Sequence, residues 1–304
     1  MHPPRAALST DEVLAFHTTL SNWGRFGPRD QLGTLNLITP EKRAAAARLV
    51  QSGRAVSAAR PLPVEPSIEN PNPVAHHMIA TATEGWGGDY FAMASHGFAT
   101  SHIDALCHIF HDGKLYNGYP TETVTAHGAL ELGIHALRDG IVSRGVLLDI
   151  PRTRQLAYLE PGEPIFPDDL ERTEHEAGLQ VESGDVLLVR TGRWALRAAR
   201  GAWDVRLSAA GLDASCLPWL HARGVAALGC DGVSDVLPSR VADVPLPIHS
   251  VAIVALGLHL IDNLDLERVA ETCASERRWE FLFMLAPLVL ERGTASPVNP
   301  IALF

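Results

Sequence analysis

The sequence predicts a mixed α/β protein. Three short aliphatic runs, each bounded by Gly, Asp or Pro, are typical of buried strands and lie at 144–150, 184–191 and 224–229. Helical patterns alternate with strands through the second half of the chain, which favours a parallel or mixed sheet. The 304 residues are 46% apolar and 20% charged, an ordinary globular composition that excludes a disordered or collagen-like chain.

Local signals predict two helices. Thr39 supplies an N-cap and Pro40 occupies the first helical position, and Gly53 stops the alanine-rich run that follows. These residues predict a helix over 40–52. A second helical pattern runs over 207–223, ends at a glycine and directly precedes the third predicted strand.

Two proline-rich segments interrupt the sequence, at 61–73 and 238–247. Neither is long enough or polar enough to link independent domains. We therefore predict that both are ordered loops that frame a site.

The net charge and the absence of targeting signals limit the kinds of partner that the protein is expected to bind. Lys and Arg total 25 against 35 Asp and Glu, a formal net charge of −10, so the chain lacks the basic footprint of a protein that binds nucleic acid or an anionic membrane. The N-terminus has no apolar signal-peptide core, and the longest apolar stretch, 250–261, is too short to span a bilayer. We expect a soluble, cytoplasmic protein that binds a small-molecule substrate.

Cysteine and histidine usage points to chemistry in a reducing compartment. The four cysteines show no CxxC pairing and are expected to be reduced thiols, mostly in the core. The chain has 14 histidines against 25 Lys and Arg, and several lie among Asp and Gly. This enrichment favours a metal site or an acid/base site.

The segment from Ser95 to His108 holds the main candidates. If residues 102–104 are extended, the period of two places His102 and Asp104 on one face, where they could share a divalent ion such as Zn or Mn. His108 follows four residues after Asp104 and could act as a base without being a ligand. Alternatively, all three are buried polar residues that bond to loop backbone, but three such groups within seven residues favour a site. Cys107 is predicted to be a packed thiol opposite the ligand face.

Other residues are weaker candidates. Trp23 and Trp86 lie in glycine-rich surroundings suited to a flat substrate wall, although covering a core is the commoner role of tryptophan. Asp231 ends the third predicted strand, and an ordinary turn is favoured over a site there. Of the tandem pair His76 and His77, at most one could face a site. The sequence contains no GxGxxG, P-loop, GxSxG or HExxH motif, which removes the usual nucleotide-binding, serine-hydrolase and zincin interpretations.

The run from Thr100 to His108 resembles the signature His-x-Gly-Thr-His-x-Asp-x-x-x-His of the cyclase family, the kynurenine formamidase-like metal-dependent hydrolases. The resemblance to the long bacterial branch of this family covers nearly the whole chain, through segments 33–36, 115–120, 145–149, 229–234, 247–249, 261–264 and 294–300.

The resemblance implies a fold and a set of roles. The fold is a β-rich core of mixed sheets flanked by helices, of the swivelling β/β/α type. It forms a single domain over residues 1–304 with an N-terminal helical arm over about residues 1–55. In the family's pattern His102 and Asp104 are metal ligands and His108 is the catalytic acid/base. The resemblance also implies a homo-oligomer.

One position departs from the family's pattern. The first ligand histidine of the signature falls on Phe98, which cannot bind a metal and is grouped instead with Trp23 and Trp86 as a substrate-binding candidate. His96 lies two residues earlier and could replace the missing ligand if a bulge near Gly97 shifts the strand register.

The resemblance also points to two ligands far along the chain. A family carboxylate corresponds to Asp262, which is one methylene shorter than the usual glutamate. His249 approximates a family histidine that closes the site, and the alternative for His249 is a bond to loop backbone.

Three functions are consistent with these observations. The first is a metal-dependent hydrolase of a small cyclic or aromatic amide, formamide or lactone, in which a metal activates water and His108 moves the proton. The second is a metal-free cyclase or dehydratase that uses His102, Asp104 and His108. The third is a non-catalytic small-molecule binder.

Overall fold

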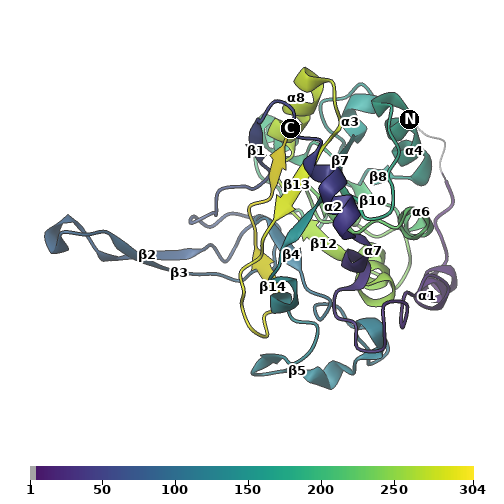
Figure 1. Cartoon of the computed structure of the whole chain (residues 1–304), viewed down its shortest axis with the longest axis horizontal. Helices are drawn as coiled ribbons and strands as arrows, with labels where there is room; N and C mark the ends of the chain where they lie inside the picture. Colours follow the sequence, from purple (N-terminus) through teal and green to yellow (C-terminus); the bar gives the residue numbers. More distant parts are fainter. Residues whose placement is uncertain (1–4) are drawn as a thin grey trace.

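The computed structural model describes residues 5–304 and confirms a mixed α/β fold with a large curled sheet flanked by helices (Figure 1). The four central strands of this nine-stranded sheet run parallel, and the strands on both sides of them are antiparallel to their neighbours. In sheet order the strands are β1 (Ala55–Ser57), β15 (Ile301–Leu303), β13 (Glu280–Leu285), β7 (Ile141–Asp149), β9 (Val186–Arg190), β11 (Ala227–Cys230), β12 (His259–Asp262), β4 (His102–Asp104) and β14 (Ala295–Pro297).

The remaining elements are short strand pairs and helices. The pairs are β2 (Ala75–Ala80) with β3 (Gly88–Ala92), β5 (Val124–Thr125) with β6 (Gly128–Ala129), and β8 (Pro164–Ile165) with β10 (Gly211–Leu212). The α-helices are α1 (Thr10–Thr19), α2 (Pro40–Ala47), α3 (Ile150–Thr153), α4 (Pro167–Ala177), α5 (Arg193–Arg200), α6 (Leu217–Arg223), α7 (Pro247–Val251) and α8 (Glu267–Glu276). Single helical turns are η1 (Gly33–Leu37), η2 (Ala82–Glu84), η3 (Tyr116–Gly118), η4 (Thr121–Thr123), η5 (Ile134–Leu137), η6 (Ala214–Cys216) and the π-type η7 (Ala252–Leu256).

The three predicted strands are the central strands β7, β9 and β11. All residues of β9 and β11 are buried, which explains why these segments are continuous apolar runs rather than alternating ones. Helix α2 packs against β7 and β13, and α3 and α4 pack against β9 and β7. The core therefore lies between the parallel strands and the helices that cover them.

Helix α2 begins where the sequence predicts and ends earlier. The Thr39 hydroxyl accepts a hydrogen bond from the Lys42 amide, and Pro40 occupies the first turn. The helix ends at Ala47 rather than at Ser52. The reason is tertiary, because the backbone amides of Ser52 and Gly53 donate to the carbonyl of the C-terminal residue Phe304 instead of to the preceding helical turn.

The helix predicted over 207–223 is wrong in its first half. Residues 211–212 form β10, which pairs with β8, and α6 begins only at Leu217. The backbone amides of Ala209 and Leu212 donate to the carbonyl oxygens of residues 237 and 234. The backbone of this segment therefore makes hydrogen bonds to a distant segment instead of the hydrogen bonds within a helix. Residues 209–214 are all buried, so the apolar residues there do not mark one face of a helix.

Strands β2 and β3 form an antiparallel hairpin, residues 75–92, that projects from the body of the molecule (Figure 1). Both strands pair only with each other in the described chain. The proline-rich segment 61–73 leads into this hairpin, and the second proline-rich segment leads into α7.

Among residues 5–304 no helix is long and apolar enough to cross a lipid bilayer. Residues 1–4 lie outside the described residues. They are the start of the predicted N-terminal arm and of the N-terminal stretch that lacks a signal-peptide core. The single-domain division over 1–304 stays a prediction.

Candidate metal centre

Strand β4 presents His102 and Asp104 on one face, because side chains alternate along an extended chain. The strand lies between β12 and β14, and Asp262 of β12 is directly opposite His102 in the antiparallel register. Opposite residues in such a pair share a face, so the Asp262 carboxylate joins the same side of the sheet. All three side chains are buried.

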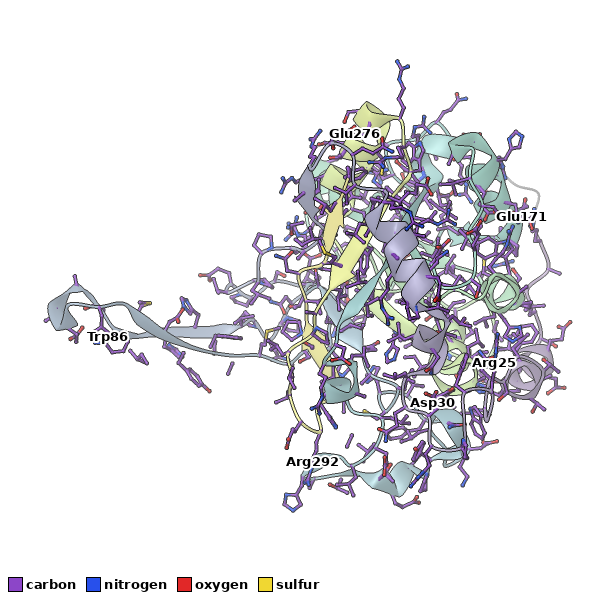
Figure 2. All side chains as sticks on the ribbon, in the orientation of Figure 1. Arg25, Asp30, Trp86, Glu171, Glu276 and Arg292 are labelled. Atoms are coloured by element: carbon purple, nitrogen blue, oxygen red, sulfur yellow. The ribbon has the colours of Figure 1, made fainter. Side chains whose placement is uncertain are left out.

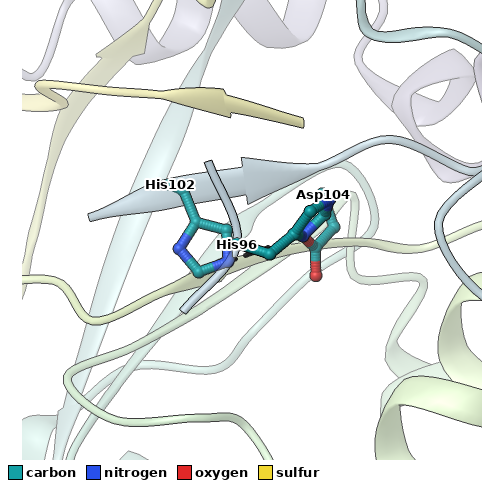
Figure 3. A group of neighbouring side chains, drawn as sticks. All are labelled: His96, His102 and Asp104. Carbon is teal, nitrogen blue, oxygen red and sulfur yellow. Dashed lines mark ion pairs between the residues drawn. The ribbon is translucent and has the colours of Figure 1, made fainter. Parts of the chain in front are cut away.

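His96 reaches this face from a loop and not from a strand. Residues 95–100 are a series of bends, so no strand register or bulge applies to them. The Nδ1 atom of His96 lies 2.9 Å from Oδ1 of Asp104, and Nε2 of His102 lies 3.5 Å from the same oxygen (Figure 3). The structure thus brings together the two histidines and the aspartate without the bulge near Gly97 that the sequence interpretation required.

Two polar contacts orient the histidines. Nδ1 of His102 donates to the carbonyl oxygen of Thr100 at 2.8 Å, which leaves its Nε2 unprotonated in the neutral ring and directed toward Asp104. Nε2 of His96 lies 3.0 Å from the hydroxyl of Thr294, in the loop before β14. Each imidazole therefore has one nitrogen held by the protein and one that faces the carboxylate, as is usual for metal-ligating histidines.

The loop that carries His96 is itself held by buried side chains. The Asn263 amide donates to the carbonyls of Gly97 and Thr100, at 2.8 and 3.1 Å. The Arg193 guanidinium donates to Asn263 Oδ1 and to the carbonyl of Phe98. These contacts replace strand pairing as the determinant of the loop's shape.

His249 enters from the first turns of α7. Asp235 accepts hydrogen bonds from the amides of Ile248 and His249, at 2.6 and 3.1 Å, and its Oδ2 lies 2.6 Å from His249 Nδ1. The other nitrogen, Nε2, lies 3.3 Å from Asp262 Oδ2 and 3.7 Å from Asp104 Oδ2. Burial lowers the pKa of His249, but Asp235 and Asp262 outweigh it and raise the pKa well above its usual value.

The five metal-ligand candidates of the sequence form two groups that share one carboxylate. One group is His96, His102 and Asp104, and the other is Asp104, His249 and Asp262; within each group the ligand atoms lie within 4.8 Å of one another. Among the described residues these are the groups with metal-ligand geometry. Asp104 is therefore the central residue of the cluster.

The surroundings of Asp104 fit a cation. Apart from the ion pair between His96 Nδ1 and Asp104 Oδ1, these atoms and the second oxygen of Asp104 are buried without a hydrogen-bond partner. Burial opposes ionisation of Asp104, but His96, His102, His108 and His249 outweigh it and hold the pKa of the carboxyl below its usual range. A buried carboxylate that is paired with only one imidazole at hydrogen-bond distance is costly, and a divalent ion held by imidazoles and carboxylates would remove that cost.

His108 lies beside the cluster without belonging to either group. Its ring stacks on that of His96, with centroids 3.7 Å apart and an interplanar angle of 12°. Burial lowers the pKa of His108 to about 4, against the opposing effect of Asp104. The imidazole is therefore neutral at pH 7 and able to accept a proton.

The sequence interpretation did not identify Asp235, His259 or Thr294. Nδ1 of His259 donates to the backbone carbonyl of Asp104 at 2.8 Å, and its Nε2 is buried without a partner; burial lowers the pKa of His259 to about 4. His259 and Asp262 both lie on β12, so a buried histidine three residues before the carboxylate was the available signal. Asp235 and Thr294 act through contacts across the fold and left no local pattern.

The structure separates the three substrate-binding candidates from the cluster. Trp23 donates from Nε1 to the carbonyl of Val254 and lines a different cavity, of about 480 Å³, with His17 and His111. Trp86 lies at the far end of the hairpin (Figure 2). The expectation that Phe98 points with the ligands by strand parity is wrong, because residues 95–100 are not a strand.

Phe98 instead packs against a small apolar cluster apart from the main core. The cluster consists of Val205, Ala209, Val233 and Leu237. The backbone carbonyl oxygen of Phe98 accepts the hydrogen bond from Arg193.

The structure also places four further residues that the sequence singled out. Asp231 is buried and accepts hydrogen bonds from the Thr191 hydroxyl and from three amides, at 191, 192 and 193, so it holds the turn between β9 and α5. His76 and His77 lie on the projecting hairpin. Cys107 is a buried free thiol, and burial raises its pKa to about 12, which makes it a poor nucleophile.

Comparison with known proteins agrees with this architecture. The family model described as "Putative cyclase" matches residues 15–235. The crystal structure of a novel cyclase is 31% identical, and the match covers 95% of this chain and 99% of that chain with a TM-score of 0.86. No curated protein matches this chain.

Two more distant structures share the fold. An isatin hydrolase bound to the product analogue thioisatinate is 17% identical over 85% of this chain and 94% of that chain, with a TM-score of 0.60. A potential metal-dependent hydrolase with cyclase activity is 19% identical over 82% of this chain and 96% of that chain, with a TM-score of 0.52. At these identities the likeness shows the fold alone.

Proposed function

This chain belongs to the cyclase family, and we propose that it is a metal-dependent hydrolase of a small cyclic or aromatic amide, formamide or lactone. The observation that carries the proposal is the buried Asp104 carboxylate, whose two oxygens face imidazole nitrogens from two sides, His96 Nδ1 at 2.9 Å and His249 Nε2 at 3.7 Å. The isatin hydrolase among the structural relatives makes isatin the first substrate to test.

His96, His102, Asp104, His249 and Asp262 would hold the metal. Mixed imidazole and carboxylate ligands suit Zn or Mn. A divalent ion in such a site polarises a substrate carbonyl and lowers the pKa of water to near neutrality.

The protein's own residues supply the proton transfer. During attack of water on the carbonyl carbon, a ring nitrogen of neutral His108 accepts the proton that the water loses. When the C–N or C–O bond breaks, the same nitrogen returns that proton to the departing nitrogen or oxygen. The products are a carboxylic acid and an amine or alcohol, joined in one molecule if the substrate is cyclic.

Other side chains keep these groups in place. Asp235 fixes the orientation of His249, and the Ser234 hydroxyl donates to Asp262 Oδ1 at 3.0 Å. The carbonyl of Thr100 fixes the tautomer of His102. Such outer contacts typically change metal affinity by about 10–100-fold when they are removed.

Metal content and turnover test the proposal together. Protein purified without chelator is expected to contain about one or two equivalents of Zn or Mn by elemental analysis. It should hydrolyse isatin or a related cyclic amide or lactone, lose that activity on chelation and regain it on readdition of the metal. Turnover without any metal would favour the metal-free cyclase or dehydratase, and no turnover across the panel would favour the binder.

The roles of His96 and Phe98 can be separated by two substitutions. His96→Ala should lower metal affinity at least about 10-fold, because a direct ligand contributes no less than an outer contact. Phe98→His should leave metal affinity unchanged and lower stability by roughly 1–3 kcal/mol, because the phenyl group packs on apolar side chains. Metal titration and thermal melts measure both effects.

The matched control is His127→Ala, an exposed histidine outside the cluster, which should change neither quantity. A gain in metal affinity in Phe98→His, or full affinity in His96→Ala, would contradict the assignment of His96 as a ligand.

A further inference from the structure

Glu69 is a buried acid in a segment that is otherwise accessible to solvent. Of residues 61–73, the proline-rich segment before the hairpin, Glu69 alone is buried, whereas its neighbour Ile68 is 54% exposed. The backbone amides of Ser67 and Asn70 each donate to the other residue's carbonyl at 3.0 Å, so the two residues between them form the tip of a tight turn. The charged residue of this tip points inward and the apolar residue outward, the reverse of the usual preference. The buried carboxylate therefore requires a partner.

Two arginines of α5 supply that partner. Arg193 and Arg197 are four residues apart, so they lie on one face of the helix. The Nε atom of Arg197 donates to Oε1 of Glu69, and Nη2 of Arg193 lies 3.5 Å from Oε2. The side chains of Glu69 and Arg193 are only 2% and 3% exposed, whereas that of Arg197 is 34% exposed. The ion pair that is buried on both sides is therefore the one between Glu69 and Arg193.

Arg193 depends on Glu69 for the compensation of its charge. No other carboxylate of the described residues forms an ion pair with this guanidinium. Burial lowers the pKa of Arg193 to about 10, and Glu69 opposes this shift more strongly than Asp231 or Asp262 does. The guanidinium also stacks on the Trp194 indole, 4.3 Å from the ring centroid, which fixes its orientation. Without Glu69 the interior would hold a cation that has no ion-pair partner.

The same guanidinium holds the loop that carries His96. Its Nη2 atom donates to the carbonyl oxygen of Phe98, and its Nη1 atom donates to Oδ1 of Asn263. The side-chain amide of Asn263 in turn donates to the carbonyls of Gly97 and Thr100, at 2.8 and 3.1 Å. One cation therefore holds this loop at three backbone carbonyls, one of them directly and two through Asn263.

The carbonyls of this loop position two of the metal-ligand candidates. His96 is part of the loop, so its imidazole moves with the loop backbone. The carbonyl of Thr100, which Asn263 holds, also accepts the hydrogen bond from Nδ1 of His102 at 2.8 Å. A shift of the loop would therefore displace the imidazole of His96 and free the ring of His102 to rotate.

A cavity beside the ion pair gives this arrangement room to change. Its volume is about 490 Å³. The residues that line it include Glu69, Ala99, Trp194 and Arg197. If Glu69 lost its charge, the Arg193 guanidinium would turn toward the water of this cavity, because solvation there replaces the missing ion pair. Its donors would then leave the loop.

We propose that Glu69 is a positioning residue for the metal centre: its buried carboxylate keeps Arg193 against the loop and thereby sets the metal affinity of a site to which it supplies no ligand. The metal part of this inference rests on the proposed function. Neither Glu69 nor Arg193 belongs to either ligand group, so neither is a catalytic residue. The alternative is that Glu69 only anchors the proline-rich segment, in which case its loss would lower stability and leave the metal centre unchanged.

Metal titration of the full chain, after chelation of any bound ion, tests the charge of Glu69. Glu69→Gln should lower the affinity for Zn or Mn about 10–100-fold, the usual effect of removing a contact that orients a ligand. Glu69→Asp keeps the charge on a side chain that is one methylene shorter, so it should lose less affinity than the glutamine variant. An affinity within a few-fold of wild type in a folded Glu69→Gln variant would overturn the proposal.

The matched control is Glu174→Gln. Glu174 is a buried carboxylate of α4 that lies 2.7 Å from Arg223 and accepts a hydrogen bond from the Val181 amide at 2.6 Å, so its contacts do not involve the loop. This variant should lose thermal stability and keep its metal affinity. An equal loss of metal affinity in both glutamine variants would assign the effect to general destabilisation and overturn the proposal.

A third variant keeps the test decisive if Glu69→Gln does not fold. Arg193→Lys preserves the positive charge opposite Glu69 but lacks the planar group that donates to Asn263 and to the Phe98 carbonyl together. It should lose metal affinity to a similar extent. Unchanged metal affinity in Arg193→Lys would show that the guanidinium does not position the loop.

Hydrogen exchange of the metal-free chain measures the loop directly and needs neither metal nor substrate. The amides of residues 95–104 should exchange several-fold faster in Glu69→Gln than in wild type, and at the wild-type rate in Glu174→Gln. Unchanged exchange in a folded Glu69→Gln variant would contradict the positioning role. If the wild type binds no metal, the proposed function fails, whereas faster exchange still shows that Glu69 positions the loop. The two failures are therefore distinguishable.

Discussion

Replacing Asp104 by asparagine should remove most of the metal from this protein. Asp104 is the one residue shared by both ligand groups, and its two oxygens face His96 on one side and His249 on the other. The amide has nearly the same shape but no charge, and it presents one oxygen instead of two. Loss of metal affinity should exceed the roughly 10–100-fold that outer contacts contribute. Titration of the apoprotein with Zn or Mn measures the change.

The control is Asp231→Asn, because Asp231 is equally buried but accepts hydrogen bonds from three amides and one hydroxyl. An asparagine there cannot accept all of them, and a buried unpaired donor costs about 1–3 kcal/mol. This variant should lose thermal stability and keep its metal. Equal loss of metal in both variants would show that Asp104 has no special part in binding.

Replacing His108 by alanine should lower kcat by about 10²- to 10⁴-fold and leave the metal content unchanged. The reason is that His108 stacks on His96 but belongs to neither ligand group. We therefore expect His108 to transfer the proton and not to bind the metal ion. Elemental analysis and turnover of the same preparation measure the two effects separately.

His111→Ala serves as the matched control. His111 lies three residues further on and stacks on His17, away from the ligand groups, so its loss should change kcat by no more than a few-fold. Activity of His108→Ala within a few-fold of wild type would assign the base to another residue. Loss of metal from His108→Ala would mean that His108 is a ligand.

Several features could be predicted from the sequence because they depend on a few neighbouring residues. The apolar runs around 144–150, 184–191 and 224–229 identify the central strands, since a strand covered on both faces must be apolar throughout. Thr39 and Pro40 mark the start of α2. The alternation of His102 and Asp104 follows from strand geometry alone.

Features that depend on distant backbone were predicted poorly. The end of α2 is set by the C-terminal carbonyl of Phe304, and the segment before α6 pairs with residues near 163 and 235. In each case the local pattern was compatible with a helix, and hydrogen bonds to a remote segment decided otherwise.

The loop that carries His96 and Phe98 shows the same limit at the site. Strand parity placed Phe98 with the ligands, but Arg193 and Asn263 hold residues 97–100 in a series of bends that turns His96 inward. The residues that shape this loop follow it by about a hundred positions or more, so no pattern within the loop itself reveals its conformation.

The sequence by itself predicted a mixed α/β chain, a His-x-Asp pair on one strand face and a histidine four residues beyond it. The family resemblance names His249 and Asp262 as further ligands, but only the tertiary structure shows how they reach that pair, through α7 and through the antiparallel pairing of β12 with β4. Periodicity reports the face on which a residue lies within its own element. Which faces come together depends on how the whole sheet buries its apolar surface, and no local segment contains that information.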